Sequence, residues 1–158
     1  MEGNDLRDSC DAGMDVQSSC NNLTITNNSV RDCGAEWEPG FWIKGDGHVV
    51  TKNVAHGNRG DGFRIGGNGI SLDGNVAKEN GIDGFDIHGG SVDSVTLTNN
   101  RAIGNGGEGI ENNGSNAVVE NNVSTGNRID FATDGSEASF VGNVIQDGSD
   151  QATLPETD

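Results

Sequence analysis

Short runs of alternating apolar and polar residues recur along the whole chain. Examples are LTITN (23–27), HVVTKN (48–53), VTLTNN (95–100) and AVVENN (117–122). Alternation with a period of two predicts β-strands that bury one face and expose the other. Glycine and asparagine interrupt every copy before a helix of about ten residues could form. The pattern therefore predicts an all-β chain with no helical domain.

The strands belong to a repeat. KNVAHGNRGDGFRI (52–65) matches GNVAKENGIDGFDI (74–87), and related copies occur before and after this pair. Seven copies of 21–25 residues can be aligned, the last one incomplete. Such a period indicates a solenoid, in which a core forms only when successive turns stack. We expect a parallel β-solenoid of about seven turns over residues 3–147, followed by an acidic tail, 148–158, whose composition predicts disorder.

The aligned copies define columns of apolar residues. One contains Met14, Phe41, Phe63, Phe85, Ile110 and Phe131; a second, two residues later, contains Val16, Ile43, Ile65 and Ile87; a third contains Ile25, Val50, Leu72, Leu97, Val119 and Phe140. We expect these side chains to point inward, because residues two apart on a strand share a face.

Asparagine forms two columns of its own. The first holds Asn4, Asn28, Asn53, Asn75, Asn100, Asn122 and Asn143, and the second holds Asn58, Asn80, Asn105 and Asn127. Amides stacked about 4.8 Å apart can hydrogen-bond along the axis as a ladder, as they do in cross-β structures. The asparagines are therefore predicted to be structural.

Composition narrows the choice of partners. The chain has 158 residues and a net charge of −16, which argues against nucleic acid and anionic membranes as partners. No apolar run reaches the length of a membrane helix, and the N-terminus lacks the apolar core of a signal peptide. The compartment stays open; it would be extracellular if the chain is a piece of a secreted protein. The low apolar content of 31% also fits disorder, but the periodicity favours the solenoid.

Single residues outside the columns carry less information. Three cysteines allow at most one internal bridge, and the alignment makes Cys10 and Cys33 the pair to consider. His48 and His56 show no evident partner in the sequence.

The strand that carries the phenylalanine column should present a polar patch on its outer face. The alignment brings together Trp42, Lys44, Arg64, Asp86, His88, Glu111 and Asn113, with Trp37 in an insertion beside them. Asp86, His88 and Arg64 could act as base, acid and charge stabiliser. Lys44 and Arg64 could hold a sugar carboxylate, and Trp37, Trp42, Glu111 and Asn113 could line the same binding surface. The alternative is a solvated strand face with ordinary cross-strand ion pairs.

The N-x-x-x-x-N…G-F repeat resembles that of the right-handed parallel β-helix proteins. This superfamily includes pectate lyases, mannuronan C5-epimerases and the carbohydrate-binding and sugar-hydrolase β-helix domains. The resemblance covers residues 3–147 and implies a single-stranded right-handed parallel β-helix.

The stretch F-D-I-H (85–88) is similar to the F-D-P-H motif of alginate C5-epimerases, which implies a catalytic role for Asp86 and His88. Ile87 replaces the proline of the motif, and the chain has no tyrosine, whereas that family uses one as a proton carrier. A complete epimerase site of that type is therefore not expected. A lyase in which Arg64 is the base and calcium is held by Asp86 and Glu111 resembles the pectate lyase scheme.

Two functions from different classes remain open. One is a protein that binds or modifies a polysaccharide, with an acidic sugar polymer as the favoured ligand. The other is a non-catalytic structural or interaction module, or a fragment of a larger secreted protein. A groove beside Trp37 would favour the first, and a patch whose charges all pair internally would favour the second. Because no capping segment precedes the first turn, we also expect a homodimer formed by end-to-end stacking at that turn.

Overall fold

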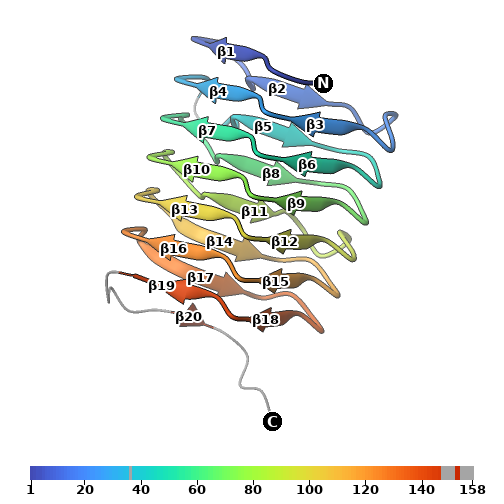
Figure 1. The fold of residues 1–158 in the computed structure, drawn as a ribbon, viewed down its shortest axis with the longest axis vertical. Coiled ribbons are helices and arrows are strands. Elements are labelled where there is room, and N and C mark those ends of the chain that lie inside the picture. The colour runs from blue at the N-terminus through green and yellow to red at the C-terminus, as the bar shows by residue number, and fades with distance from the viewer. Residues whose placement is uncertain (36, 147–151, 154–158) are drawn as a thin grey trace.

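The computed structural model describes residues 1–35, 37–146 and 152–153, and these residues form a parallel β-solenoid (Figure 1). Each of the first six turns contributes one short strand to each of three sheets. The described residues contain no helix. This confirms the all-β solenoid predicted from the repeat, with a turn count close to the expected seven.

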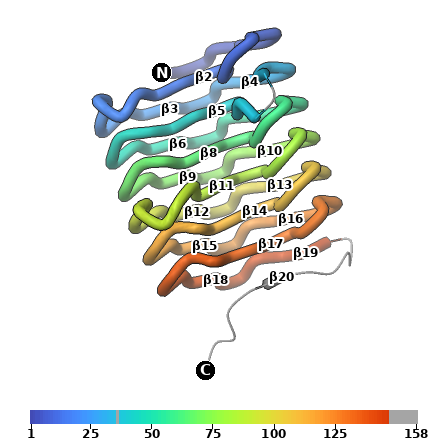
Figure 2. Tube along the Cα trace, turned by 180° about the vertical axis from the view of Figure 1, so that it is seen from behind, coloured from blue at the N-terminus to red at the C-terminus, as the bar shows by residue number. Residues whose placement is uncertain are grey.

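The three sheets run side by side along the axis, and Figure 2 shows the same stack from behind. The first consists of β1 (Asp5–Arg7), β4 (Ser29–Arg31), β7 (Val54–His56), β10 (Val76–Lys78), β13 (Arg101–Ile103), β16 (Val123–Thr125) and β19 (Val144–Ile145). The second consists of β2 (Met14–Val16), β5 (Phe41–Ile43), β8 (Phe63–Ile65), β11 (Phe85–Ile87), β14 (Glu108–Asn112), β17 (Ile129–Thr133) and β20 (Ala152–Thr153). The third consists of β3 (Thr24–Thr26), β6 (Val49–Thr51), β9 (Ser71–Asp73), β12 (Thr96–Thr98), β15 (Val118–Glu120) and β18 (Ser139–Val141).

The core is a set of straight columns. Phe41, Phe63 and Phe85 are fully buried, and their rings stack with centroid distances of 4.6 and 4.9 Å at interplanar angles of 7° and 5°. The register pairs each of them with its counterpart in the next turn, as the alignment predicts. The isoleucine column two residues later is buried in the same way. Parallel stacking thus gives Phe63 a ring of equal size in the turn on either side, while Met14 and Ile110 continue the column beyond Phe41 and Phe85.

The first asparagine column is a continuous hydrogen-bonded ladder. Asn53 Nδ2 donates to Asn75 Oδ1 at 3.0 Å, and Asn75 Nδ2 donates to Asn100 Oδ1 at 3.0 Å. The backbone N–H of Asn53 donates to the same Asn75 Oδ1 at 2.9 Å, and Asn75 Nδ2 also reaches the carbonyl of Val50 at 2.9 Å. Each buried amide therefore satisfies its oxygen and both of its N–H groups without water.

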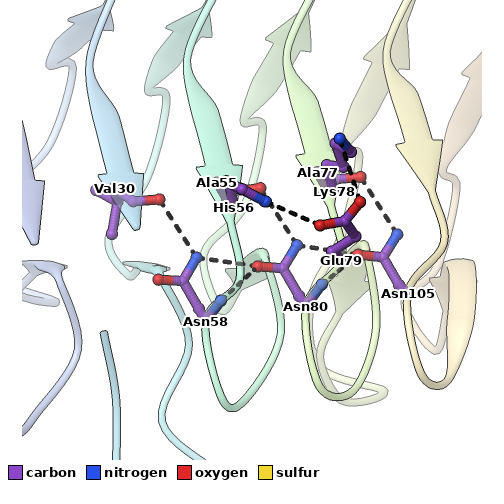
Figure 3. Close-up of polar contacts among 9 residues, drawn as sticks. All are labelled: Val30, Ala55, His56, Asn58, Ala77, Lys78, Glu79, Asn80 and Asn105. Carbon is purple, nitrogen blue, oxygen red and sulfur yellow. Dashed lines mark hydrogen bonds and ion pairs between the residues drawn. The ribbon is translucent and has the colours of Figure 1, made fainter. Parts of the chain in front are cut away.

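The second column forms a parallel ladder, shown in Figure 3. Asn58 Nδ2 donates to Asn80 Oδ1, and Asn80 Nδ2 donates to Asn105 Oδ1, both at 2.9 Å. The glycines before Phe41, Phe63 and Phe85 are required by this ladder. A Cβ added to Gly62 would lie 2.8 Å from Asn80 Nδ2 and 2.7 Å from the carbonyl oxygen of Gly84, in the next turn. The G-F pair of the repeat is therefore a packing requirement of the neighbouring asparagine.

The second ladder ends on a carboxylate. Asn127 Nδ2 donates to Asp130 Oδ1 at 2.9 Å and to Ser124 Oγ at 2.8 Å. Asp130 occupies the slot that glycine holds in earlier turns, opposite Gly109 in the register of β14 and β17. Position 148, where the next asparagine of the column would fall, is glycine. A buried acid within the last full turn thus takes the place of the missing amide.

The structure also bears on the expectations for the histidines, the cysteines and membrane-spanning segments. His48 and His56 do have partners, so that expectation was wrong: His48 accepts from the backbone N–H of Leu23 and contacts the Lys44 carbonyl oxygen, and His56 pairs with Glu79. Within the described part of the chain all three cysteines are free. The described residues therefore also contain no helix that could cross a membrane.

The two ends leave two predictions open. Most of the predicted tail lies outside the described residues; Ala152–Thr153 within it forms β20, which pairs in parallel with β17. At the other end β1, β2 and β3 are edge strands in their sheets. End-to-end stacking of two copies at this turn stays a prediction.

The ladder makes a prediction about stability. Asn75→Ala should lower the free energy of unfolding by roughly 2–4 kcal/mol, because it leaves two buried donors and one buried carbonyl without partners. Asn68→Ala is the matched control, since Asn68 is exposed and accepts from the backbone N–H of Asp93, which water can satisfy instead. Denaturant unfolding followed by circular dichroism measures both. Equal losses in the two variants would contradict a stabilising role for the buried ladder.

Candidate functional site

The outer face of the second sheet carries one polar row with one residue per turn. The parallel register places Trp42 beside Arg64, Arg64 beside Asp86, and Asp86 beside Glu111. Strands of one sheet lie about 4.8 Å apart, so these side chains are immediate neighbours. The row is the one that the alignment of repeats predicts.

Arg64 is held in place by two carboxylates. Its Nε lies 2.7 Å and its terminal nitrogen 2.6 Å from Asp61 Oδ2, and Nε also lies 3.4 Å from Asp86 Oδ2. Its guanidinium carbon lies 4.9 Å from the centroid of the Trp42 ring, within the range of a cation–π contact. The side chain of Arg64 is only 18% exposed, and these contacts hold its guanidinium group in one place. It is suited to positioning its neighbours, and a role as the base stays a prediction.

Asp86 is buried although it points to the outer face, with 4% of its surface exposed. One oxygen, Oδ2, contacts Arg64 and His88, while Oδ1 is buried and has no hydrogen-bond partner among the described residues. Burial, with the nearby charge of Asp61, raises the pKa of Asp86 to about 6, against the opposing effect of His88 and Arg64. A carboxyl group in such surroundings can change its protonation near neutral pH.

His88 is the exposed member of the pair. Its Nδ1 lies 3.0 Å from Asp86 Oδ2, and 54% of its side chain is accessible. The ionised carboxylate accepts from Nδ1–H and so leaves the lone pair on Nε2, which bonds to no other described residue. The imidazole also packs against Trp42, with centroids 5.9 Å apart and rings tilted by 54°. Asp86 and Trp42 thus fix the orientation of a histidine whose free nitrogen is open to a ligand.

A pocket of about 340 Å³ adjoins this cluster on the side of the first turns. Its lining consists of Asp11, Ala12, Asp15, Glu38, Trp42, Lys44 and Arg64. Lys44 Nζ lies 2.8 Å from Asp15 Oδ1 and 5.2 Å from the centroid of the Trp42 ring. The pocket therefore joins one aromatic face and two cations, Lys44 and Arg64, to three carboxylates.

The remaining predicted residues lie nearby but outside this cluster. Trp37 is 66% exposed, and it is its neighbour Glu38, not Trp37, that lines the pocket. Glu111 lies beside Asp86 in the register, and the backbone N–H of Asn113 donates to the Ile87 carbonyl. The structure joins Trp42, Lys44, Arg64, Asp86 and His88 through a chain of pairwise contacts and leaves Trp37, Glu111 and Asn113 at the margin.

Sequence reasoning missed a buried column of acids beneath the site. Asp61 Oδ1 accepts from the backbone N–H of Asp83 at 3.1 Å, and Asp83 Oδ1 accepts from that of Glu108 at 2.6 Å. Burial raises the pKa of Asp83 to about 8, with a further contribution from its side-chain contact with Glu108. The available signal was an acid two residues before the core position in GDGF, IDGF and GEGI. Only the fold shows that one of these acids anchors Arg64.

The calcium ligands expected from the pectate lyase resemblance are not assembled. Calcium takes six to eight oxygen ligands. Over the residues that the structure describes, no group of three or more His, Cys, Asp or Glu side chains is arranged to hold a metal ion. Asp86 Oδ2 is instead engaged by Arg64 and His88.

Residues 39–154 match the family model described as a right handed beta helix region. The chain belongs to this family. Membership agrees with the stacked parallel turns and confirms the right-handed β-helix inferred from the repeat. It carries no assignment of activity, because one fold can support many functions.

Solved structures of a periplasmic alginate epimerase, AlgG, share the architecture. A point mutant of that enzyme matches with a TM-score of 0.73 at 17% identity, covering 90% of this chain and 44% of the other. Another AlgG structure matches with a TM-score of 0.61 at 16% identity, covering 78% and 40%. This chain thus spans less than half of the enzyme, and at such identities the likeness shows the fold alone. No curated protein sequence matches the chain.

The raised pKa of Asp86 predicts that the free energy of unfolding depends on pH. A carboxyl whose folded-state pKa lies above its unfolded value binds a proton preferentially in the folded state, so stability falls as pH rises from about 4 to about 6. Asp86→Asn removes this cost. It should stabilise the protein relative to wild type by about 3 kcal/mol at pH 7.5 and by less than about 1 kcal/mol at pH 4, as measured by denaturant unfolding.

Glu120→Gln is the control, because Glu120 points outward from β15 in the third sheet and is half-buried. It shows how much stability changes when an outward-pointing carboxylate of the solenoid is replaced by an amide. If the stability difference between Asp86→Asn and wild type did not grow with pH beyond that of Glu120→Gln, the raised pKa of Asp86 would be contradicted.

Proposed function

We propose that this chain binds a linear polysaccharide containing uronic acids across the outer face of the second sheet and removes a proton from it through His88. The observation that carries the proposal is the Asp86–His88 pair: a buried carboxylate that orients an exposed imidazole beside an aromatic ring. An outward strand position usually places an acid in water, whereas Asp86 is buried with one unpartnered oxygen.

The chemistry follows from the acidity of a uronic acid. Its C5–H bond lies next to a carboxylate and is the most acidic C–H bond of the ring. In the proposed step Nε2 of His88 takes this proton, and the imidazolium is stabilised by the Asp86 carboxylate. The electron pair forms a C4–C5 double bond and the C4–O4 bond breaks. The departing oxygen then takes the proton from His88, which completes an elimination with a single acid–base group.

Elimination also fits the composition better than epimerisation. Epimerisation requires a proton donor on the opposite face of the sugar, and the chain has no tyrosine to supply one. The similarity of F-D-I-H to the epimerase motif and the architecture shared with AlgG support chemistry at C5 of a uronate. They do not select between the two outcomes.

Binding is assigned to Trp42 and Lys44. The pocket beside Trp42 presents an aromatic surface on which a sugar ring can stack, and Lys44 can meet a carboxylate of the polymer. Lys44 is paired with Asp15, which is itself exposed, and exposed ion pairs contribute at most about 1 kcal/mol. A sugar carboxylate can therefore replace Asp15 at little cost.

A second function, that of a non-catalytic module, has one observation in its favour. Both cations of the patch already have carboxylate partners, Lys44 with Asp15 and Arg64 with Asp61. A face that neutralises its own charges needs no ligand. This reading leaves the buried, unpartnered oxygen of Asp86 without a role.

The proposal predicts different outcomes for binding and for chemistry. In a Trp37→Phe background Trp42 is the sole tryptophan, so its fluorescence should change saturably with polygalacturonate or alginate and not with dextran. His88→Gln should retain this binding within about threefold. It should also abolish exchange of the C5 hydrogen with deuterated solvent and formation of ultraviolet-absorbing unsaturated ends.

Lys52→Asn is the matched control, because Lys52 is an exposed cation outside the site and its backbone φ of 55° suits asparagine. It should leave binding and exchange unchanged. Binding by the wild type without formation of unsaturated ends would reduce the proposal to a sugar-binding role, and absence of both would favour the non-catalytic module.

A further inference from the structure

Most glycines of the solenoid are required by the fold. At these positions either the backbone φ is positive or an added Cβ would lie less than 3.0 Å from another atom. Gly67 is an example, because its Cβ would lie 1.6 Å from the carbonyl oxygen of Gly45 in the preceding turn. Among the glycines that the structure describes, only Gly66 and Gly90 meet neither condition. At these two positions the fold would accept a side chain.

Gly66 interrupts a column of outward side chains that directly follows the strands of the second sheet. From the first turn to the sixth the column consists of Gln17, Lys44, Gly66, His88, Asn113 and Asp134. The N–H of Gly66 donates to the Ile43 carbonyl, and that of His88 donates to the Ile65 carbonyl. Gly66 therefore lies one turn from Lys44 and one turn from His88, and it is the one member of the column without a side chain.

A side chain would fit at position 66. Of the described atoms outside residues 65–67, only Lys44 Cγ, at 3.6 Å, and the Ile43 carbonyl oxygen, at 4.0 Å, would lie within 4 Å of an added Cβ. Both are ordinary contact distances, and Gly66 is exposed. Replacing such a glycine by alanine usually stabilises a protein, because it removes conformational freedom from the unfolded chain. The glycine thus lowers stability and leaves open space between Lys44 and His88.

This space lies where the reacting sugar of the proposed elimination must sit. In that reaction Lys44 meets a carboxylate of the polymer, and Nε2 of His88 takes the proton from C5. The carboxylate of a uronic acid is attached to C5 itself, so both groups must approach the same end of one ring. Lys44 and His88 are two strands apart, which is about 10 Å at the backbone. In their column only Gly66 lies between them, so a side chain there would occupy the place of the ring.

We propose that Gly66 shapes the sugar-binding surface: its lack of a side chain keeps the place of the reacting uronic acid ring open between Lys44 and His88. This role rests on the proposed function and adds to it the position of the sugar that reacts. Gly90, the other glycine that the fold does not require, is also exposed and follows His88 by two residues. The two positions that could carry a side chain but have none therefore flank His88, one across a turn and one along the chain.

A competing role for Gly66 is to make room for the contact between Trp42 and His88, whose rings come from the turns on either side of it. An added Cβ would have no atom of either ring within 4 Å. Alanine at position 66 would therefore leave this contact unchanged and would alter only the open space above the backbone. Gly66→Ala thus separates the two roles, whereas a larger residue would affect both.

The test measures stability and function in the same variants. Gly66→Ala should keep or raise the unfolding midpoint and yet lower kcat for formation of unsaturated ends from polygalacturonate or alginate about tenfold, because a displaced ring moves C5 away from Nε2. Gly66→Leu should in addition weaken binding of the same polymer, measured by calorimetric titration, by at least about tenfold. Ser71→Leu is the matched control, because it adds bulk at an outward position of β9 in the same turn but on the third sheet. It should leave binding and turnover within about twofold of wild type.

A structural and a functional role of Gly66 give opposite results. A lower unfolding midpoint of Gly66→Ala, or binding and turnover equal to wild type in both Gly66 variants, would overturn the inference and leave the proposed function in place. If the wild type binds neither polymer, the proposed function fails and the inference falls with it, and this is known before any variant is compared. If the wild type binds but forms no unsaturated ends, the affinity of Gly66→Leu relative to Ser71→Leu decides.

Discussion

The structure depends on hydrogen bonds between asparagine side chains that run parallel to the helix axis. Strand pairing alone would tolerate small changes in the length of each turn, since every strand is only two to five residues long. The ladder does not tolerate such changes, because an amide displaced from its column would lose hydrogen bonds at both its oxygen and its nitrogen. Insertions such as the one that contains Trp37 must therefore leave the solenoid between ladder positions. This keeps the side chains on the outer faces in straight rows.

That constraint is what makes a functional site possible on so small a core. Each turn contributes one side chain to a given row, so neighbours in space are distant in sequence. Trp42, Arg64 and Asp86 come from three successive turns and meet because their turns are in register. The same geometry stacks Asp61 above Asp83, where burial raises the pKa of the latter. The fold thus gathers like charges as readily as complementary ones, and the second sheet contains both.

The two outer faces differ in the way their charges are held. On the second sheet Arg64 is bound to a fully buried aspartate, and this aspartate in turn accepts a backbone N–H of the next turn. Such a cation is rigid and can position a neighbour. On the first sheet Arg31 and Lys78 share exposed acids with other bases and remain free to rearrange. A rigid cluster around a histidine suits proton transfer, whereas exposed ion pairs such as those of the first sheet contribute little and can rearrange.

The sequence by itself determined the architecture and the membership of each row. Repetition shows each column four to seven times, so the inward phenylalanines, the asparagine ladders and the outward row from Trp42 to Glu111 could all be predicted from local alternation and period. Tertiary structure alone decided which side chains in those rows are buried and what holds them. Asp86 sits at an exposed-type position yet is buried, because Arg64 and His88 close over it and Asp61 lies close by. Asp130 ends a ladder from a position that no repeat predicts. Burial and pKa depend on contacts between turns, and no single repeat contains them.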